Sequence, residues 1–208
     1  MPVLPPLLPL FPLPNVVLFP RMPLPLHVFE PRYRSMVADA LSGPGLIGMV
    51  LLRPGWESDY YGRPEVYAVG CAGRIEQCGK LDDGRFDIVL KGAGRFRIRE
   101  EHGGKPYRLA SIDEAPEAAG ETSTLDEARG HLLEALSRAA DQPALMVTRA
   151  DLPHELFVNA LCQSLGLTPV EQQSLLDRDT LSGRYAGLLE ILEFRLLERG
   201  CGGGGSLH

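Results

Sequence analysis

The chain has 208 residues, of which 44% are hydrophobic and 23% charged, and its 21 basic and 27 acidic side chains leave a formal charge of −6. This composition is typical of a globular protein and excludes a disordered chain. Ten of the 18 prolines lie within the first 31 residues. Because these prolines block a continuous helix and the first basic residue is Arg21, we expect neither a membrane-spanning helix nor a signal peptide, but a cytoplasmic protein.

Residues 8–116 have the sequence pattern of a β subdomain. Asp83 and Gly84 predict a hairpin turn, and Gly92 and Gly94 predict a sharp reversal of the chain. Short strands separated by such turns indicate a barrel-like or rolled antiparallel sheet. In chain order, the predicted elements are a strand over 16–19, a helix with Pro31 in its first turn, and strands over 46–52, 66–77, 86–91, 95–99 and 107–112. The predicted helix face consists of Phe29, Tyr33, Met36 and Val37.

Residues 122–199 have helical spacing and follow a small, polar linker over 115–121. Capping boxes that begin at Thr124 and Thr168 predict two helix starts, and Pro153 opens a further helix. The last helix carries an apolar stripe that needs partners, so we expect the four helices to pack as a bundle. The stripe consists of Leu181, Tyr185, Leu188, Leu189, Leu192 and Leu196. The glycine-rich tail over 200–208 is expected to be flexible.

Motifs for catalysis, cofactors and metals do not occur in the sequence. His154 and Glu155 lack the second histidine of a zinc protease, because Val158 stands at that position. Gly92 and Gly94 lack the third glycine of a dinucleotide-binding loop. The four cysteines form no CxxC pair. We therefore predict no catalytic, cofactor-binding or metal-binding residue, and we expect that the chain is not an enzyme.

A row of arginines lies on the predicted polar face of one strand. Arg95, Arg97 and Arg99 alternate with Phe96 and Ile98. One interpretation is a patch for RNA or another anion. The other is an ordinary solvated strand face that neighbouring acidic side chains neutralise.

A polar, glycine-bounded loop carries Trp56, Tyr60 and Tyr61. If the rings are exposed, they are suited to bind apolar segments of a partner. If the rings fold back, they cover the sheet instead. The sequence leaves both interpretations open.

The opening of the chain resembles that of the Lon protease N-terminal (substrate-binding) domain. Residues 8–36 read LPLFPLPNVVLFPRMPLPLHVFEPRYRSM, and the resemblance continues through 68–75, 83–98 and 175–190. It covers residues 8–199 and implies an α+β fold, with an N-terminal PUA-like antiparallel β pseudo-barrel followed by a C-terminal four-helix bundle. The ATPase and protease domains of Lon have no counterpart here, so we expect a stand-alone, bacterial-type protein of this family that works without ATP.

This resemblance implies a non-catalytic module that recognises exposed apolar segments of unfolded or flexible polypeptides. It also suggests a role as an adaptor or regulator in protein quality control, with a protease or chaperone as partner. The candidate partner-binding residues are Phe29, Tyr33, Trp56, Tyr60 and Tyr61. The alternative is a PUA-like RNA-binding protein that uses the Arg95, Arg97 and Arg99 strand. No cofactor, metal or membrane partner is expected.

Overall fold

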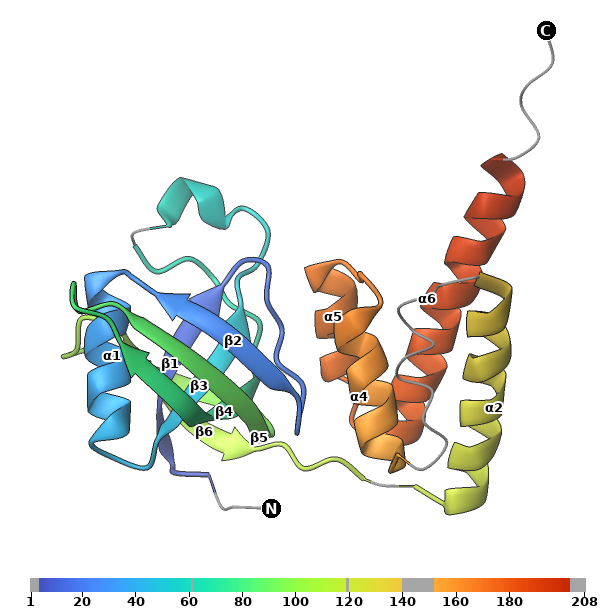
Figure 1. The fold of residues 1–208 in the computed structure, drawn as a ribbon, viewed down its shortest axis with the longest axis horizontal. Helices are drawn as coiled ribbons and strands as arrows, with labels where there is room; N and C mark the ends of the chain where they lie inside the picture. The colour runs from blue at the N-terminus through green and yellow to red at the C-terminus, as the bar shows by residue number, and fades with distance from the viewer. Residues whose placement is uncertain (1–3, 61, 119, 140–151, 203–208) are drawn as a thin grey trace, which may run out of the picture. The chain divides into compact units, whose positions relative to one another are not determined.

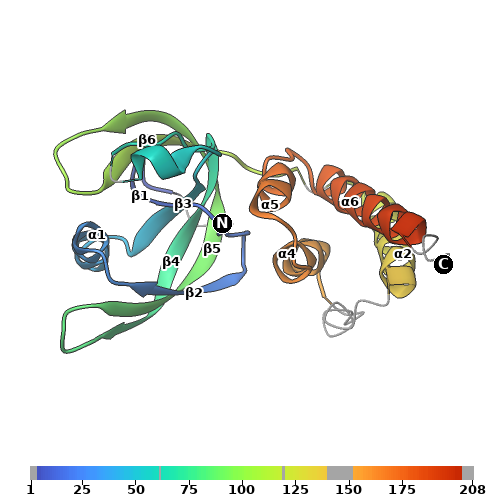
Figure 2. The same ribbon diagram turned by 90° about the horizontal axis from the view of Figure 1, so that it is seen from above.

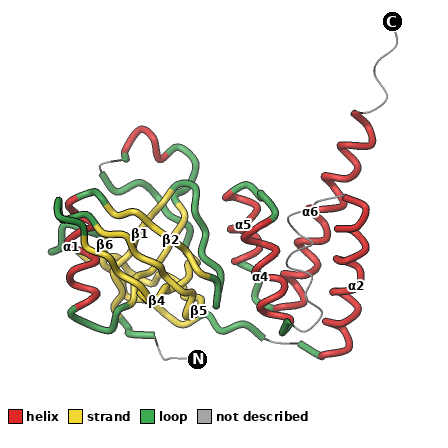
Figure 3. The backbone as a smooth tube through the Cα atoms, viewed as in Figure 1, coloured by secondary structure: helices red, strands yellow, loops and turns green. Residues whose placement is uncertain are grey.

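A computed structural model describes residues 4–60, 62–118, 120–139 and 152–202. The chain divides into two compact units, Met1–Pro116 and Glu117–His208. The first unit contains a six-stranded sheet, and the described part of the second is helical (Figure 3). The mixed α and β composition predicted from the sequence is therefore confirmed.

Strands dominate the first unit, and their pairing closes on itself. The strand order is β2-β5-β4-β3-β1-β6, and β6 also pairs with β5. The pairings of β5, β4, β3, β1 and β6 thus form a ring, with β2 added to its outside; Figure 2 shows the curvature of these strands. The elements are β1 (Leu7–Leu13), β2 (Pro23–Val28), α1 (Pro31–Leu41), β3 (Leu46–Leu51), the short 3-10 helix η1 (Trp56–Asp59), β4 (Val69–Lys80), β5 (Phe86–His102) and β6 (Arg108–Glu114).

Only the β1–β3 pair is parallel among these ladders; the other pairs are antiparallel. A central apolar cluster lies among the ring strands, and α1 packs against β1 and β3 (Figure 1). The cluster includes Leu8, Leu10, Leu46, Val50, Ala72 and Phe96.

Two predictions about the strands of this unit are wrong. Residues 16–19 are irregular, and the first strand is Leu7–Leu13 instead. Leu18 and Phe19 are fully buried, so the apolar run correctly indicated buried residues, but these residues do not belong to a strand. The predicted reversal at Gly92 is also absent, because β5 runs unbroken from Phe86 to His102.

Gly92 serves a close approach between backbones. Its N–H donates to the carbonyl of Met22 at 3.0 Å, and its own carbonyl accepts from Arg21 at 2.7 Å. A Cβ atom at this position would collide with the carbonyl of Phe19. The residue must therefore be glycine for the irregular segment to lie against β5.

Four helices are described in the second unit: α2 (Thr122–Ala139), α4 (His154–Ser164), α5 (Pro169–Leu176) and α6 (Leu181–Gly202). α6 packs against each of the other three. The predicted start at Thr124 is wrong, because α2 begins at Thr122 and Leu125 already donates to the carbonyl of Glu121. α6 includes residues 200–202 of the predicted flexible tail, and residues 203–208 lie outside the described part of the chain.

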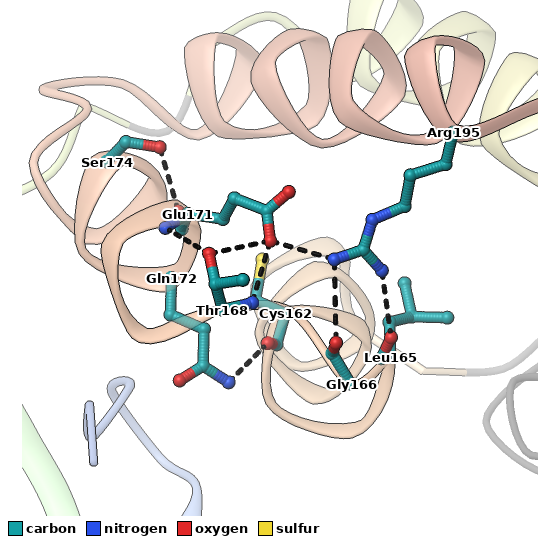
Figure 4. A network of polar contacts seen from close by, with 8 residues as sticks. All are labelled: Cys162, Leu165, Gly166, Thr168, Glu171, Gln172, Ser174 and Arg195. Carbon is teal, nitrogen blue, oxygen red and sulfur yellow. Dashed lines mark hydrogen bonds and ion pairs between the residues drawn. The ribbon is translucent and has the colours of Figure 1, made fainter. Parts of the chain in front are cut away.

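The predicted start of α5 at Thr168 is confirmed as a capping box. The Thr168 hydroxyl accepts from the N–H of Glu171, and a Glu171 carboxylate oxygen accepts from the N–H of Thr168 at 2.7 Å. Arg195 reaches from α6 to the same oxygen at 2.8 Å and donates to the carbonyls of Leu165 and Gly166 (Figure 4). Burial raises the pKa of Glu171, but these hydrogen bonds and the guanidinium outweigh it and hold the pKa below its usual value. The ion pair between Glu171 and Arg195 therefore connects α5 to α6.

Arg184 on α6 is fully buried between apolar neighbours of the predicted stripe. Its guanidinium forms a two-point ion pair with Glu117, with nitrogen–oxygen distances of 2.8 and 3.1 Å. It also donates to the side chain of Asn159 at 2.6 Å and to the carbonyl of Leu175 at 3.0 Å. The network thereby fixes the start of the second unit to three of its helices.

Candidate functional site

Phe29 and Tyr33, which the sequence places on one helix face, lie in different surroundings. Phe29 precedes α1, is 59% exposed, and its ring lies 6.2 Å from the ring of His27. Tyr33 lies within α1, is 5% exposed, and packs its ring against Phe11 at 4.3 Å. The predicted shared face is therefore wrong, because Glu30 is the N-cap and the chain is extended there.

Trp56 and Tyr60 at η1 are half-buried, and their rings meet edge to face at 5.6 Å. The Tyr60 hydroxyl donates a 2.7 Å hydrogen bond to Glu30, so the loop is tied to the start of α1. Burial and this hydrogen bond raise the pKa of Tyr60, so its hydroxyl remains a donor at neutral pH. Tyr61, the fifth candidate, lies outside the described residues.

Glu30 and Arg32 connect the aromatic residues. The Arg32 Nε donates to Glu30 at 2.9 Å, and its guanidinium lies 4.6 Å from the centre of the Tyr33 ring and 5.5 Å from that of Tyr60. Cation–π contacts of this kind orient the rings. We call Phe29, Tyr33, Trp56 and Tyr60 the aromatic patch. Tyr33 and Tyr60 are connected through Glu30 and Arg32, Trp56 contacts Tyr60, and Phe29 directly precedes Glu30 in the sequence.

A polar cavity of about 340 Å³ adjoins the aromatic patch: it shares Tyr33 with the patch and is also lined by Arg32, which contacts the Tyr33 and Tyr60 rings. Apart from Tyr33, the residues of this cavity were missed by sequence reasoning, although Lys105, Tyr107 and Arg108 form a short run of basic and aromatic character. We call it the cationic cavity. It is lined by Arg32, Tyr33, Gly62, Arg63, Lys105, Pro106, Tyr107 and Arg108.

The arginine row predicted on β5 is broken. Arg95 is only 4% exposed, which is contrary to its expected place on a solvated face. The backbone of Arg95 is paired on both sides: it lies opposite Cys71 of β4, and its carbonyl accepts from the N–H of Ala115. Arg97 and Arg99 are exposed, and Arg99 lies 3.4 Å from Asp113. Two exposed arginines, one of them paired, are a small footprint for RNA.

Groups of three or more potential metal ligands are not found among the described residues. Burial raises the pKa of the Cys162 thiol to about 12, which keeps it protonated and unreactive. In the same part of the chain, no helix is long and apolar enough to cross a membrane.

Comparison with known proteins shows a relationship over nearly the whole chain. The family model of the ATP-dependent protease La (LON) substrate-binding domain matches residues 7–193. Lon protease 2 of Myxococcus xanthus is 28% identical over 196 residues, which cover 91% of this chain and 24% of the relative. Lon protease of Flavobacterium johnsoniae is 27% identical over 203 residues, which cover 94% of this chain and 24% of the relative. The chain thus spans about a quarter of the length of these curated relatives.

Solved structures show the same fold. The N-terminal domain of Lon protease from the Mycobacterium avium complex superposes with a TM-score of 0.70 at 17% identity, covering 90% of this chain and 98% of that one. The Lon N-terminal domain protein from Xanthomonas campestris superposes with a TM-score of 0.60 at 25% identity, covering 88% and 97%. With the family model covering most of its length, the chain belongs to the family of Lon substrate-binding domains.

Proposed function

We propose that the chain binds exposed apolar segments of other polypeptides at the aromatic patch. The observation that carries this proposal is the exposed ring of Phe29 directly before Glu30, which holds the Tyr60 hydroxyl at 2.7 Å and Arg32 at 2.9 Å. Exposed aromatic side chains are typical of surfaces that bind apolar groups, and Glu30 links Phe29 along the chain to the half-buried ring of Tyr60. Membership of a substrate-binding domain family supports the same conclusion.

The patch is held in place before a partner arrives. Trp56 and Tyr60 have few rotatable bonds, and the Glu30 hydrogen bond already fixes the position of Tyr60. Binding then costs little side-chain entropy, although a patch of a few rings buries a small area. Single apolar segments are expected to bind with dissociation constants of micromolar or weaker.

The proposal extends to a binding role without catalysis. The matched family model describes a substrate-binding domain and neither an ATPase nor a protease domain. We propose that the chain acts as an adaptor or regulator and presents bound polypeptides to a protease or chaperone. We further assign the closed ring of strand pairings to a PUA-like pseudo-barrel and the packing of α2, α4 and α5 on α6 to a four-helix bundle.

The single tryptophan of the chain, Trp56, provides a reporter within the patch. Titration with a ten-residue peptide rich in Leu and Phe, which itself lacks tryptophan, is expected to change Trp56 emission with saturation in the micromolar range. A peptide of equal length in which Ser and Gln replace the apolar residues is the control. The anisotropy of labelled peptides measures the same binding independently. Equal binding of both peptides, or no binding at millimolar concentration, would contradict the proposal.

A further inference from the structure

Positive charge lines the cationic cavity without an acidic lining residue. Four of its lining side chains are cations, Arg32, Arg63, Lys105 and Arg108, and the rest are Tyr33, Gly62, Pro106 and Tyr107. Carboxylates that do not line the cavity neutralise three of these four charges. Arg32 pairs with Glu30 at 2.9 Å, Lys105 with Asp39 at 2.9 Å, and Arg108 with Glu101 at 3.4 Å. The cavity therefore presents cationic donors while most of their charge is already balanced.

Two donors at the cavity are unused. The hydroxyl of Tyr33, a residue 5% exposed, has no hydrogen-bond partner among the described residues. The guanidinium of Arg63 is exposed and forms no ion pair within the same part of the chain. Its backbone N–H donates to the Asp59 carboxylate at 3.1 Å. Both residues line the cavity, so each can donate to a ligand that enters it.

The unused hydroxyl is a donor at neutral pH. Burial raises the pKa of Tyr33 to about 12, although the positive charges of Arg32 and Arg108 act in the opposite direction. Arg32 and Arg108 line the same cavity as Tyr33, so the three residues can act on one bound group. A phenol hydroxyl beside guanidinium groups suits an oxygen anion, and the planar fork of arginine matches a carboxylate.

We propose that the cationic cavity receives a carboxylate group of the polypeptide whose apolar side chains lie on the aromatic patch. This inference rests on the proposed function and adds a substrate class to it: apolar segments that end in, or carry close by, an acidic group. Tyr33 belongs to both features, and Arg32 of the cavity lies against its ring, so the two features are next to each other. The carboxylates of Glu30, Asp39 and Glu101 pair with three of the four cations, and the small remaining surplus of positive charge favours a singly charged carboxylate over a doubly charged phosphate.

The test uses three labelled peptides with the same apolar sequence. One ends in a free carboxylate, one in an amide, and one in an amide preceded by Glu. Anisotropy titrations are expected to show that both acidic peptides bind about tenfold more tightly than the neutral one. A charge-assisted hydrogen bond contributes a free energy of this size. Arg63→Gln and Tyr33→Phe should each reduce this preference to about twofold or less.

Arg97→Gln is the matched control, because Arg97 is an exposed arginine of the same unit that does not line the cavity. It should retain the tenfold preference. If Tyr33→Phe fails to fold, the exposed Arg63 variant decides the question. Equal binding of acidic and neutral peptides overturns this inference and leaves the proposed function intact, whereas binding of none of the three overturns both. Displacement of the acidic peptide by submillimolar inorganic phosphate, at constant ionic strength, would assign the cavity to phosphate and overturn the carboxylate.

Discussion

Replacement of Phe29 by alanine should weaken the binding of apolar peptides by a predictable amount. A Phe side chain buries about 200 Å² when fully covered. Because Phe29 is 59% exposed, about 120 Å² of its surface is open to a partner. At about 25 cal/mol per Å², complete coverage contributes about 3 kcal/mol as an upper bound. Partial coverage and the ordering of the ring reduce this to about 1–2 kcal/mol, or about 5–30-fold in the dissociation constant.

The matched control for this prediction is Phe194→Ala. Phe194 has the same side chain, is 62% exposed, and lies on α6 of the other unit. Both substitutions remove an exposed ring, so both proteins should unfold at close to the wild-type urea concentration. Anisotropy titration with the Leu- and Phe-rich peptide should show weakening for Phe29→Ala alone. An equal effect of the two substitutions, or none for Phe29→Ala, would refute the assignment of the patch.

Three further predictions concern charge and packing. Arg184→Met should destabilise the second unit by about 3 kcal/mol in urea unfolding, because it removes the two-point ion pair of the largely buried Glu117 carboxylate. Adding Glu117→Gln to it should recover part of that loss, and further destabilisation would argue against the pair. Gly92→Ala should cost about 2 kcal/mol of unfolding free energy, because its Cβ meets a backbone carbonyl; a wild-type midpoint would contradict this close approach. The Lys105 and Tyr107 hydrogen bonds hold the pKa of Asp39 below its ordinary value, so they stabilise the fold above that value and cease to do so as the pH falls through the lowered pKa. Carboxyl NMR titration should show this pKa rising in Lys105→Gln, and an unchanged pKa would exclude the interaction.

Local sequence signals placed one helix start correctly and one wrongly, since the capping box expected at Thr124 lies inside α2. The capping box at Thr168 specifies a helix start through its own side chain, and it was placed correctly. Apolar runs were less informative, because Leu18 and Phe19 are buried without belonging to a strand. Burial depends on what covers a residue, whereas a ladder depends on a partner strand distant in sequence. The β1 strand, which contains prolines and pairs with β3 and β6, was missed for this reason.

The candidate site was less predictable than the fold. Aromatic residues in a polar loop pointed to Trp56 and Tyr60, but nothing local indicates that Tyr60 bonds to Glu30 across the chain. The cationic cavity joins α1 to residues 62–63 and 105–108, and charged residues from such separate segments show no common spacing. Likewise, the buried Arg184 lies inside an apolar helix stripe, where periodicity predicts only packing.

Backbone amide NMR of the chain during titration with the apolar peptide tests the central claim most directly. The account predicts that the largest shifts fall on residues 28–33 and 56–60, with saturation at the dissociation constant found by anisotropy. With the free-carboxylate peptide, shifts should extend to residues 105–108. Largest shifts on the helices of the second unit, or shifts spread evenly without saturation, would contradict binding at the aromatic patch.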